Sequence, residues 1–174
     1  RWRLELKRHQ ALMRVLAQEE ARLQPLQGRE RSASADAPRH ETLAVGHRSR
    51  PLRLERWIPQ SPRSDQTWVL MMPGLGGDPN HFHWLARSLM QAGWPVLVLE
   101  HPGSDAAAVQ GLLEGRQSFD GAAALRDRLA DLAAVLEAQQ RGDLNIPGNE
   151  VVLMGHSLGA LTALLASGAQ LVPG

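Results

Sequence analysis

The chain has 174 residues, about the size of one domain, and 43% of them are hydrophobic, which is enough to bury one sizeable core. Its 19 basic and 18 acidic side chains leave a formal charge of +1, so the composition gives no concentrated positive field for binding nucleic acid. Cysteine is absent, which excludes disulfides, thiolate metal sites and a cysteine nucleophile. No uninterrupted apolar run approaches the ~18 residues that a membrane span needs.

Residues 1–24 are predicted to form an amphipathic helix, since residues 2–23 contain no Gly or Pro. His9 and Glu20 interrupt the apolar stripe, so a docking or coiled-coil helix and a loosely attached solvated helix both stay open. Contact with an anionic membrane through the basic residues of this helix is a less favoured reading. The polar and small residues of 25–40 predict a linker.

The remaining residues, 41–174, predict an α/β domain. A hairpin of two antiparallel strands is expected at 42–45 and 52–58, around a turn that contains Gly46. Continuous apolar runs, typical of parallel strands covered on both faces, occupy 67–72, 95–99 and 150–154. Helices are expected over 80–92, 121–140 and 160–169. The second helix has a core-facing stripe of Leu125, Leu129, Leu132 and Leu136. The order predicts an antiparallel hairpin leading into a parallel sheet with helices on both faces.

The strongest chemical signal is the pattern Gly155-His156-Ser157-Leu158-Gly159, which lies between a predicted strand and a predicted helix. A nucleophilic serine needs a tight turn that lifts its hydroxyl above the sheet, and flanking glycines allow that turn and close packing of the next helix. The turn also places Ser157 at a helix N-terminus, where the dipole favours developing negative charge. The competing reading is a serine that merely caps the helix.

A second glycine-rich segment, Pro73-Gly74-Leu75-Gly76-Gly77, follows an earlier buried strand. In this position the N–H groups of Leu75 and Leu158 can form an oxyanion hole for an acyl-transfer transition state. Gly74 and Gly76 also begin a dinucleotide fingerprint, with Glu100 as a ribose contact. The third glycine of that fingerprint is replaced by Pro79, so nucleotide binding is the weaker alternative.

Three segments in this order resemble the α/β-hydrolase fold: Met72-Pro73-Gly74-Leu75-Gly76-Gly77, Leu99-Glu100-His101-Pro102-Gly103-Ser104-Asp105 and Gly155-His156-Ser157-Leu158-Gly159-Ala160. More narrowly, they resemble the bacterial hydrolases often called predicted dienelactone hydrolases, which are similar to platelet-activating-factor acetylhydrolase. The resemblance covers 41–174 and implies Ser157 as the nucleophile, with backbone donors at Leu75 and Leu158. The family usually has His before the first glycine of the loop, where this chain has Pro73.

A serine nucleophile of this fold needs an acid and a histidine that follow it in the chain. The residues after Ser157 contain no Asp, Glu or His. The chain also begins at Arg1 and ends at Gly174, so we expect both ends to be cuts through a longer chain, with the acid and the histidine beyond residue 174. The present residues would then be the N-terminal part of the fold, inactive on its own.

The other candidate residues are expected to have structural or pocket-lining roles and not catalytic ones. His101 and His156 are expected to shape the wall of a substrate pocket, together with Gly74 and Gly76. His81 and His83 diverge on a helix, which disfavours a metal site. Asp105 and Asp120 are expected to be loop or capping residues.

The leading hypothesis is therefore a serine hydrolase that cleaves a small-molecule or lipid-like carboxylic ester, with no metal, cofactor or nucleic acid. The alternative is a non-catalytic α/β module with a vestigial serine turn that acts through its N-terminal helix. Oligomeric state stays open. Since no export signal is recognisable, the cytoplasm is favoured weakly.

Overall fold

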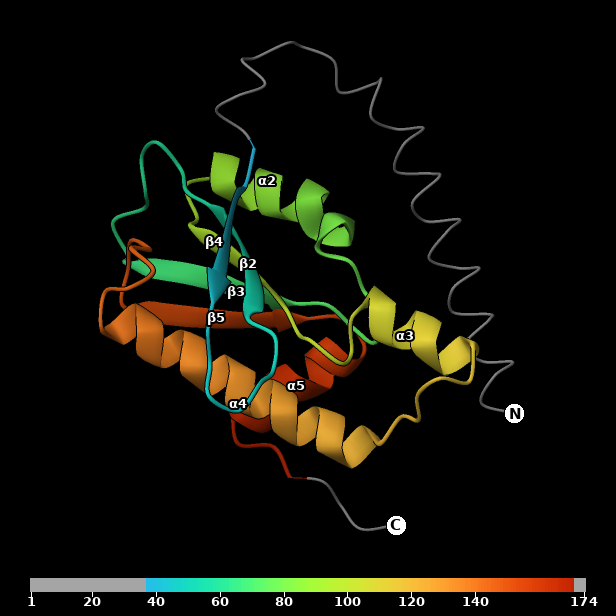
Figure 1. The fold of residues 1–174 in the computed structure, drawn as a ribbon. Coiled ribbons are helices and arrows are strands. Elements are labelled where there is room, and N and C mark those ends of the chain that lie inside the picture. Colours follow the sequence, from blue (N-terminus) through green and yellow to red (C-terminus); the bar gives the residue numbers. More distant parts are fainter. Residues whose placement is uncertain (1–36, 171–174) are drawn as a thin grey trace, which may run out of the picture. The chain divides into compact units, whose positions relative to one another are not determined.

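The computed structural model describes residues 37–170. The predicted helix over 1–24 and most of the predicted linker lie outside this range. Within it, five strands form one sheet in the order β1-β2-β4-β3-β5 (Figure 1). The strands are β1 (Arg39–Leu43), β2 (Leu52–Trp57), β3 (Thr67–Met72), β4 (Val96–Glu100) and β5 (Glu150–Gly155). β1 and β2 pair antiparallel, β2 pairs antiparallel with β4, and β3 pairs parallel with both β4 and β5.

Helices cover both faces of the sheet, as the alternating sequence pattern predicts. They are η2 (Pro79–Phe82), α2 (His83–Gln91), α3 (Ala106–Leu113), α4 (Gly121–Gln140) and α5 (Leu158–Ala166). Figure 1 shows α2 on one face and α4 with α5 on the other. The core divides accordingly: Met90 packs with one face of the sheet, and Leu132 and Ala163 pack with the other.

The first strand and the helix α3 differ from the sequence prediction. β1 begins at Arg39, so the last two residues of the segment predicted as linker belong to the sheet. The position of β1 is set by its register with β2, in which Arg39 faces Arg56 and Leu43 faces Leu52. Helix α3 was not predicted, although the side chain of Asp105 caps it by accepting a hydrogen bond from the N–H of Ala108.

Helix α4 has the predicted bounds but a different buried face. Leu125 and Leu132 of the expected stripe are buried, whereas Leu129 and Leu136 are partly exposed. Arg128 and Asp131 are buried in their place, together with Val135 and Ala138. Two charged side chains therefore lie on the face of α4 that packs against the sheet and α5.

Strand β5 forms one edge of the sheet within the described residues. Its side chains are less covered than those of the central strands, and Val152 is 42% exposed. The described residues include no helix that is both long enough and apolar enough to cross a membrane.

Candidate active site

The turn from β5 to α5, which we call the elbow (residues 155–159), holds Ser157 in a strained backbone conformation. Its φ is 54° and its ψ is −118°, in a region that side-chain-bearing residues rarely occupy. The hydroxyl of Ser157 makes no capping hydrogen bond to α5, and the residue is exposed. The strain therefore presents the hydroxyl to solvent and does not serve a helix cap.

The two outer glycines of the elbow allow its close packing. A Cβ atom at Gly159 would lie 2.0 Å from the carbonyl oxygen of Met72, at the end of β3. A Cβ atom at Gly155 would lie 2.2 Å from the carbonyl carbon of Gly159. The N–H of His156 also donates to the Met72 oxygen, at 3.2 Å. Only glycine fits at both positions, and the elbow is tied to the strand that leads into the other glycine-rich segment.

That segment, residues 73–77, is called the glycine loop, and it lies directly against Ser157. A Cβ atom at Gly74 would be 3.0 Å from the Cβ of Ser157 and 3.5 Å from Nδ1 of His156. The loop turns back at Gly77, whose N–H donates to the carbonyl oxygen of Gly74. The structure therefore brings Gly74, His156 and Ser157 together.

Helix α3 and the segment before it support the other side of the glycine loop. The N–H of Gly76 donates to the carbonyl oxygen of Ser104 at 2.8 Å, and Val109 packs against Gly76, which has a φ of 70°. Within the described residues, neither the N–H of Leu75 nor that of Leu158 donates to a backbone carbonyl. Both N–H groups therefore remain available as donors next to the elbow.

A network of charged side chains is centred on Asp131, which is fully buried. Its carboxylate accepts hydrogen bonds from Nε2 of His47 at 2.7 Å, from Nε and Nη2 of Arg48 at 2.8 and 2.6 Å, and from Nδ1 of His101 at 2.9 Å. His47 and Arg48 lie in the turn between β1 and β2 (residues 44–51), and His101 follows β4. The network joins this turn to helix α4.

Burial and hydrogen bonding shift the pKa values of this network in opposite ways. Burial lowers the pKa of His101 to about 4 against the raising effect of its hydrogen bond to Asp131, so the ring is neutral at pH 7. Burial alone would raise the pKa of Asp131, but the hydrogen bonds from His101, Arg48 and His47 lower it to about 2. At neutral pH, Asp131 is thus ionised and His101 donates from Nδ1.

A buried cation, Arg128, lies one helical turn before Asp131. Its Nε donates to Oγ1 of Thr162 at 3.0 Å, its Nη1 to Oγ of Ser104 at 2.7 Å, and its Nη2 to the carbonyl oxygen of Pro73. Burial lowers the pKa of Arg128 to about 10, so the guanidinium stays charged at neutral pH. This side chain links α4 to the glycine loop, to the segment after β4 and to α5.

The predicted histidines occupy different environments. His156 is exposed beside Gly74, whereas His101 is 2% exposed and lies beneath the site, with no hydrogen-bond partner for its Nε2 within the described residues. His81 accepts from the N–H of Asp78, and Nε2 of His83 contacts Glu55 at 2.7 Å, so the two rings face different partners. No group of three potential metal ligands occurs in the described part of the chain.

Two of the carboxylates considered in the sequence analysis, Asp105 and Asp120, cap helices. Asp120 caps α4 by accepting from the N–H groups of Ala122 and Ala123, as Asp105 caps α3. Glu100 lines a cavity of about 250 Å³, and burial raises its pKa. Pro79, at the position where a dinucleotide fingerprint has its third glycine, begins the short helix η2.

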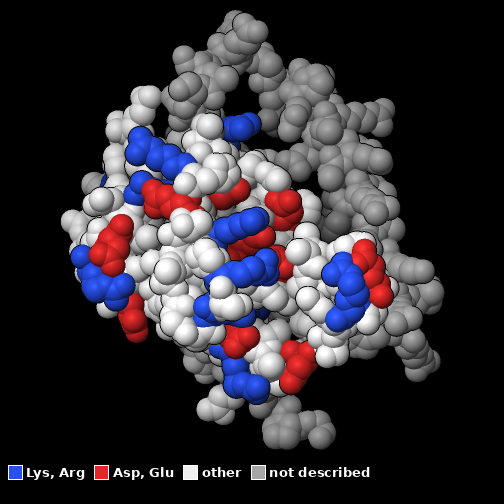
Figure 2. All heavy atoms as spheres, in the orientation of Figure 1, with Lys and Arg blue, Asp and Glu red and all other residues white. Residues whose placement is uncertain are grey.

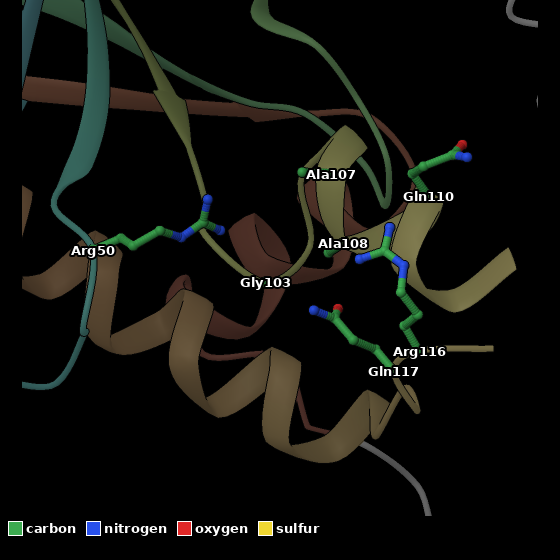
Figure 3. Close-up of a pocket in the computed structure, with 7 residues that line it drawn as sticks. All are labelled: Arg50, Gly103, Ala107, Ala108, Gln110, Arg116 and Gln117. Atoms are coloured by element: carbon green, nitrogen blue, oxygen red, sulfur yellow. The ribbon is translucent and has the colours of Figure 1, made fainter. Parts of the chain in front are cut away.

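A larger cavity of about 360 Å³ lies beside α3 (Figure 3). Figure 3 shows Arg50, from the turn between β1 and β2, and Gln117, which follows α3, extending into it from opposite sides. Ser157, Leu75 and Leu158 are not among its lining residues, so this cavity is separate from the elbow.

Basic and acidic side chains are interleaved on the face seen in Figure 2. Among the described residues, ion pairs such as Arg50 with Asp105 at 3.0 Å and Arg53 with Glu100 at 3.8 Å bring opposite charges together. On this face the charges of one sign are therefore largely offset by neighbours of the other.

Arg128, Asp131 and Arg48 are the residues near the site that sequence reasoning missed. The available signal was that Arg128 and Asp131 fall at the i, i+3 spacing of the apolar stripe through Leu125 and Leu132. A charged residue beside an apolar stripe is ordinarily expected at the edge of the solvent-exposed face of a helix. The sequence pattern alone therefore does not show that these two side chains are buried.

No protein-family model matches the sequence, and no curated protein matches it significantly. Solved structures do resemble the chain. A ferulic acid esterase from Streptomyces cinnamoneus matches with a TM-score of 0.60 at 16% identity, over 75% of this chain and 54% of the esterase. An α/β serine hydrolase without lid from Xanthomonas campestris matches with a TM-score of 0.51 at 21% identity, over 75% of this chain and 56% of its own.

The thermostable carboxylesterase EstE1, from a metagenomic library, matches with a TM-score of 0.53 at 20% identity, over 91% of this chain and 48% of the esterase. The chain thus spans about half the length of these three proteins. Identities this low establish the architecture and not the substrate. The strand order, the helices on both faces and these likenesses together show that the chain has the α/β-hydrolase fold.

Proposed function

We propose that this protein is a serine hydrolase that cleaves carboxylic esters through an acyl-enzyme intermediate, with Ser157 as the nucleophile. The observation that carries the proposal is the backbone of Ser157, which is strained at a φ of 54° while its hydroxyl caps nothing. Strain of this kind costs about 1–3 kcal/mol and persists where the surroundings enforce it, often at functional sites. Gly155, Gly159 and Gly74 supply the surroundings here.

In the proposed reaction, the Ser157 hydroxyl oxygen attacks the acyl carbon of the ester while its proton passes to a histidine. The carbonyl oxygen becomes an oxyanion, which accepts hydrogen bonds from the N–H groups of Leu75 and Leu158. Collapse of the tetrahedral intermediate breaks the ester bond and releases the alcohol, which takes the proton from the histidine. Water then hydrolyses the acyl-enzyme by the same steps, which returns the proton to Ser157.

The histidine and the acid that orients it are proposed to lie beyond residue 174. Two facts support this: the residues after Ser157 hold no Asp, Glu or His, and the chain spans about half the length of the hydrolases it resembles. As a finer proposal, the substrate is a small or lipid-like ester, in keeping with the resemblance to the predicted dienelactone hydrolases and platelet-activating-factor acetylhydrolase.

A fluorophosphonate probe tests the proposal, because it labels an activated serine and not an ordinary hydroxyl. The protein should be expressed with the residues that follow position 174 in its gene, and compared with Ser157→Ala. Ser167→Ala is the matched control, because Ser167 is an exposed serine at the far end of α5. We expect labelling of the wild type and of the control, and none of Ser157→Ala.

A folded wild-type protein that takes up no probe would overturn the proposal. That result would support the alternative of a non-catalytic α/β module. Circular dichroism of the same samples establishes that the protein is folded.

A further inference from the structure

We propose that Arg128 is the positioning residue of the oxyanion hole, holding the segments that carry both of its donors. The inference rests on the function proposed above and adds to it a residue that does not touch the substrate. Arg128 projects from α4, is 1% exposed, and directs all three guanidinium nitrogens to hydrogen-bond acceptors.

The first set of contacts holds the glycine loop on either side of Leu75. Nη2 of Arg128 donates to the carbonyl oxygen of Pro73, two residues before Leu75. Nη1 donates to Oγ of Ser104, and the carbonyl oxygen of the same Ser104 accepts from the N–H of Gly76, immediately after Leu75. The peptide that carries the Leu75 N–H is therefore fixed from both ends.

The second contact holds the start of α5, where Leu158 lies. Nε of Arg128 donates to Oγ1 of Thr162 at 3.0 Å, and Oγ1 of Thr162 donates to the carbonyl oxygen of Leu158 at 2.8 Å. Because Thr162 is itself fully buried, this two-bond chain fixes the first turn of α5 relative to α4. One planar group thus sets the position of the glycine loop relative to the elbow.

The chemistry of the contacts favours a positioning role over a contribution to stability. The acceptors are two hydroxyls and a carbonyl, all uncharged, and no carboxylate lies within hydrogen-bond distance of the guanidinium in the described residues. Burying a cation that no carboxylate hydrogen-bonds is costly even with Asp131 near enough to favour its charge, and an apolar side chain on the same helix face would avoid that cost. A rigid fork with donors in three directions is what distinguishes Arg here from Lys or Met.

The test uses the protein expressed with the residues that follow position 174, as in the labelling experiment above. The variants are Arg128→Met and Arg128→Lys. Arg126→Met is the matched control, because Arg126 is an exposed arginine on the same helix. Active sites are counted with the fluorophosphonate probe, so that rates refer to folded enzyme. With p-nitrophenyl acetate we expect Arg128→Met to lower kcat about 100-fold, comparable to loss of one oxyanion donor, with KM changed little. Arg128→Lys should fall in between, and Arg126→Met should match the wild type.

A second measurement separates positioning from folding. A trifluoromethyl ketone forms a tetrahedral adduct with the serine, so its affinity depends on the oxyanion hole. We expect its affinity to fall in Arg128→Met by the same factor as kcat/KM, as transition-state mimics do when a transition-state contact is lost. If Arg128→Met lowers only the number of active sites and leaves kcat per site unchanged, the proposal is wrong.

If Arg128→Met does not fold, two variants that each remove a single side-chain hydroxyl test the inference instead. Ser104→Ala removes one of the two links from Arg128 to the glycine loop and leaves the bond to Pro73, and Thr162→Val removes the link to Leu158, while both leave the guanidinium in place. Each should lower kcat about 3- to 10-fold without raising KM, as expected for loss of one supporting hydrogen bond. Unchanged kcat in both variants refutes the inference, whereas a wild-type protein that the probe does not label refutes the proposed function itself.

Discussion

The buried histidine His101 is the residue whose protonation the fold most strongly resists. Around its ring lie Asp131, which accepts from Nδ1, and the cations Arg48 and Arg128, which both disfavour a further positive charge. A protonated His101 would place a third cation around one buried carboxylate. Burial first, and the two cations after it, keep the ring neutral, with a pKa of about 4 against 6.5 for an unperturbed histidine.

This difference predicts that stability falls between pH 6.5 and pH 4. In that window the unfolded chain binds a proton at His101 that the folded protein does not bind, so acid favours unfolding by up to about 3 kcal/mol. Asp131 adds to the loss at lower pH, since its pKa of about 2 lies below the ordinary 3.8. We expect urea unfolding at pH 7, 6, 5 and 4.5 to show the decline.

His101→Asn is the informative comparison, because its amide nitrogen can replace Nδ1 as the donor to Asp131 but does not titrate. The variant should show a flatter dependence on pH across the same window. An equally steep dependence in the variant would show that His101 is not the group responsible.

At the scale of single residues, the sequence predicted the tight turn at Ser157 but not the side chains that support it. The turn was predictable because it requires glycines at fixed spacing on both sides. Arg128 and Asp131 were not, because charged residues are rarely buried and the helical pattern assigns them to solvent. Their burial depends on partners more than 20 residues away in the chain, such as Ser104 and Arg48.

Among the elements, the contact between α5 and β3 is the tightest approach in the elbow region. A methyl group at Gly159 would fall 2.0 Å from the Met72 carbonyl oxygen, which is a backbone atom that cannot rotate away. We predict that Gly159→Ala lowers the free energy of unfolding by about 3 kcal/mol, at the upper end for overpacking.

Gly121→Ala is the matched control for this prediction. Gly121 also lies in the first turn of a helix, α4, but its Cβ would meet its nearest neighbour, Phe119, at an ordinary 3.6 Å. The change should raise stability by about 0.5–1 kcal/mol through helix propensity. Thermal unfolding of both variants measures the contrast. Equal effects on stability would show that the close approach of β3 and α5 does not exclude a side chain at position 159.

Elements with strong local signals were predicted well. Helix α4 matches its predicted bounds because Asp120 caps one end and a long apolar pattern follows. The short α3 was missed because eight residues carry too little periodicity. The position of β1 depends on its register with β2, which local sequence does not determine.

For the molecule as a whole, the arrangement around Ser157 predicts that the 174-residue polypeptide does not hydrolyse esters. The residues after Ser157 hold no Asp, Glu or His, and His101 is buried and bound to Asp131. Without a general base, serine is a weak nucleophile. Turnover of p-nitrophenyl acetate by this polypeptide should equal that of its Ser157→Ala variant.

Turnover by the 174-residue polypeptide that depends on Ser157 would contradict this prediction. It would mean that a histidine among residues 1–174 serves as the base. His156→Gln would then identify or exclude the histidine next to the serine.

The link between Arg48 and Asp131 also has a consequence for biosynthesis. The two residues are 83 positions apart. At about 5–20 residues per second, a ribosome adds Asp131 about 4–17 s after Arg48. During that interval His47 and Arg48 lack the carboxylate that they bind in the folded protein, so their part of the turn between β1 and β2 should become ordered late. A nascent chain stalled before α4 emerges should therefore leave this part of the turn open to proteases.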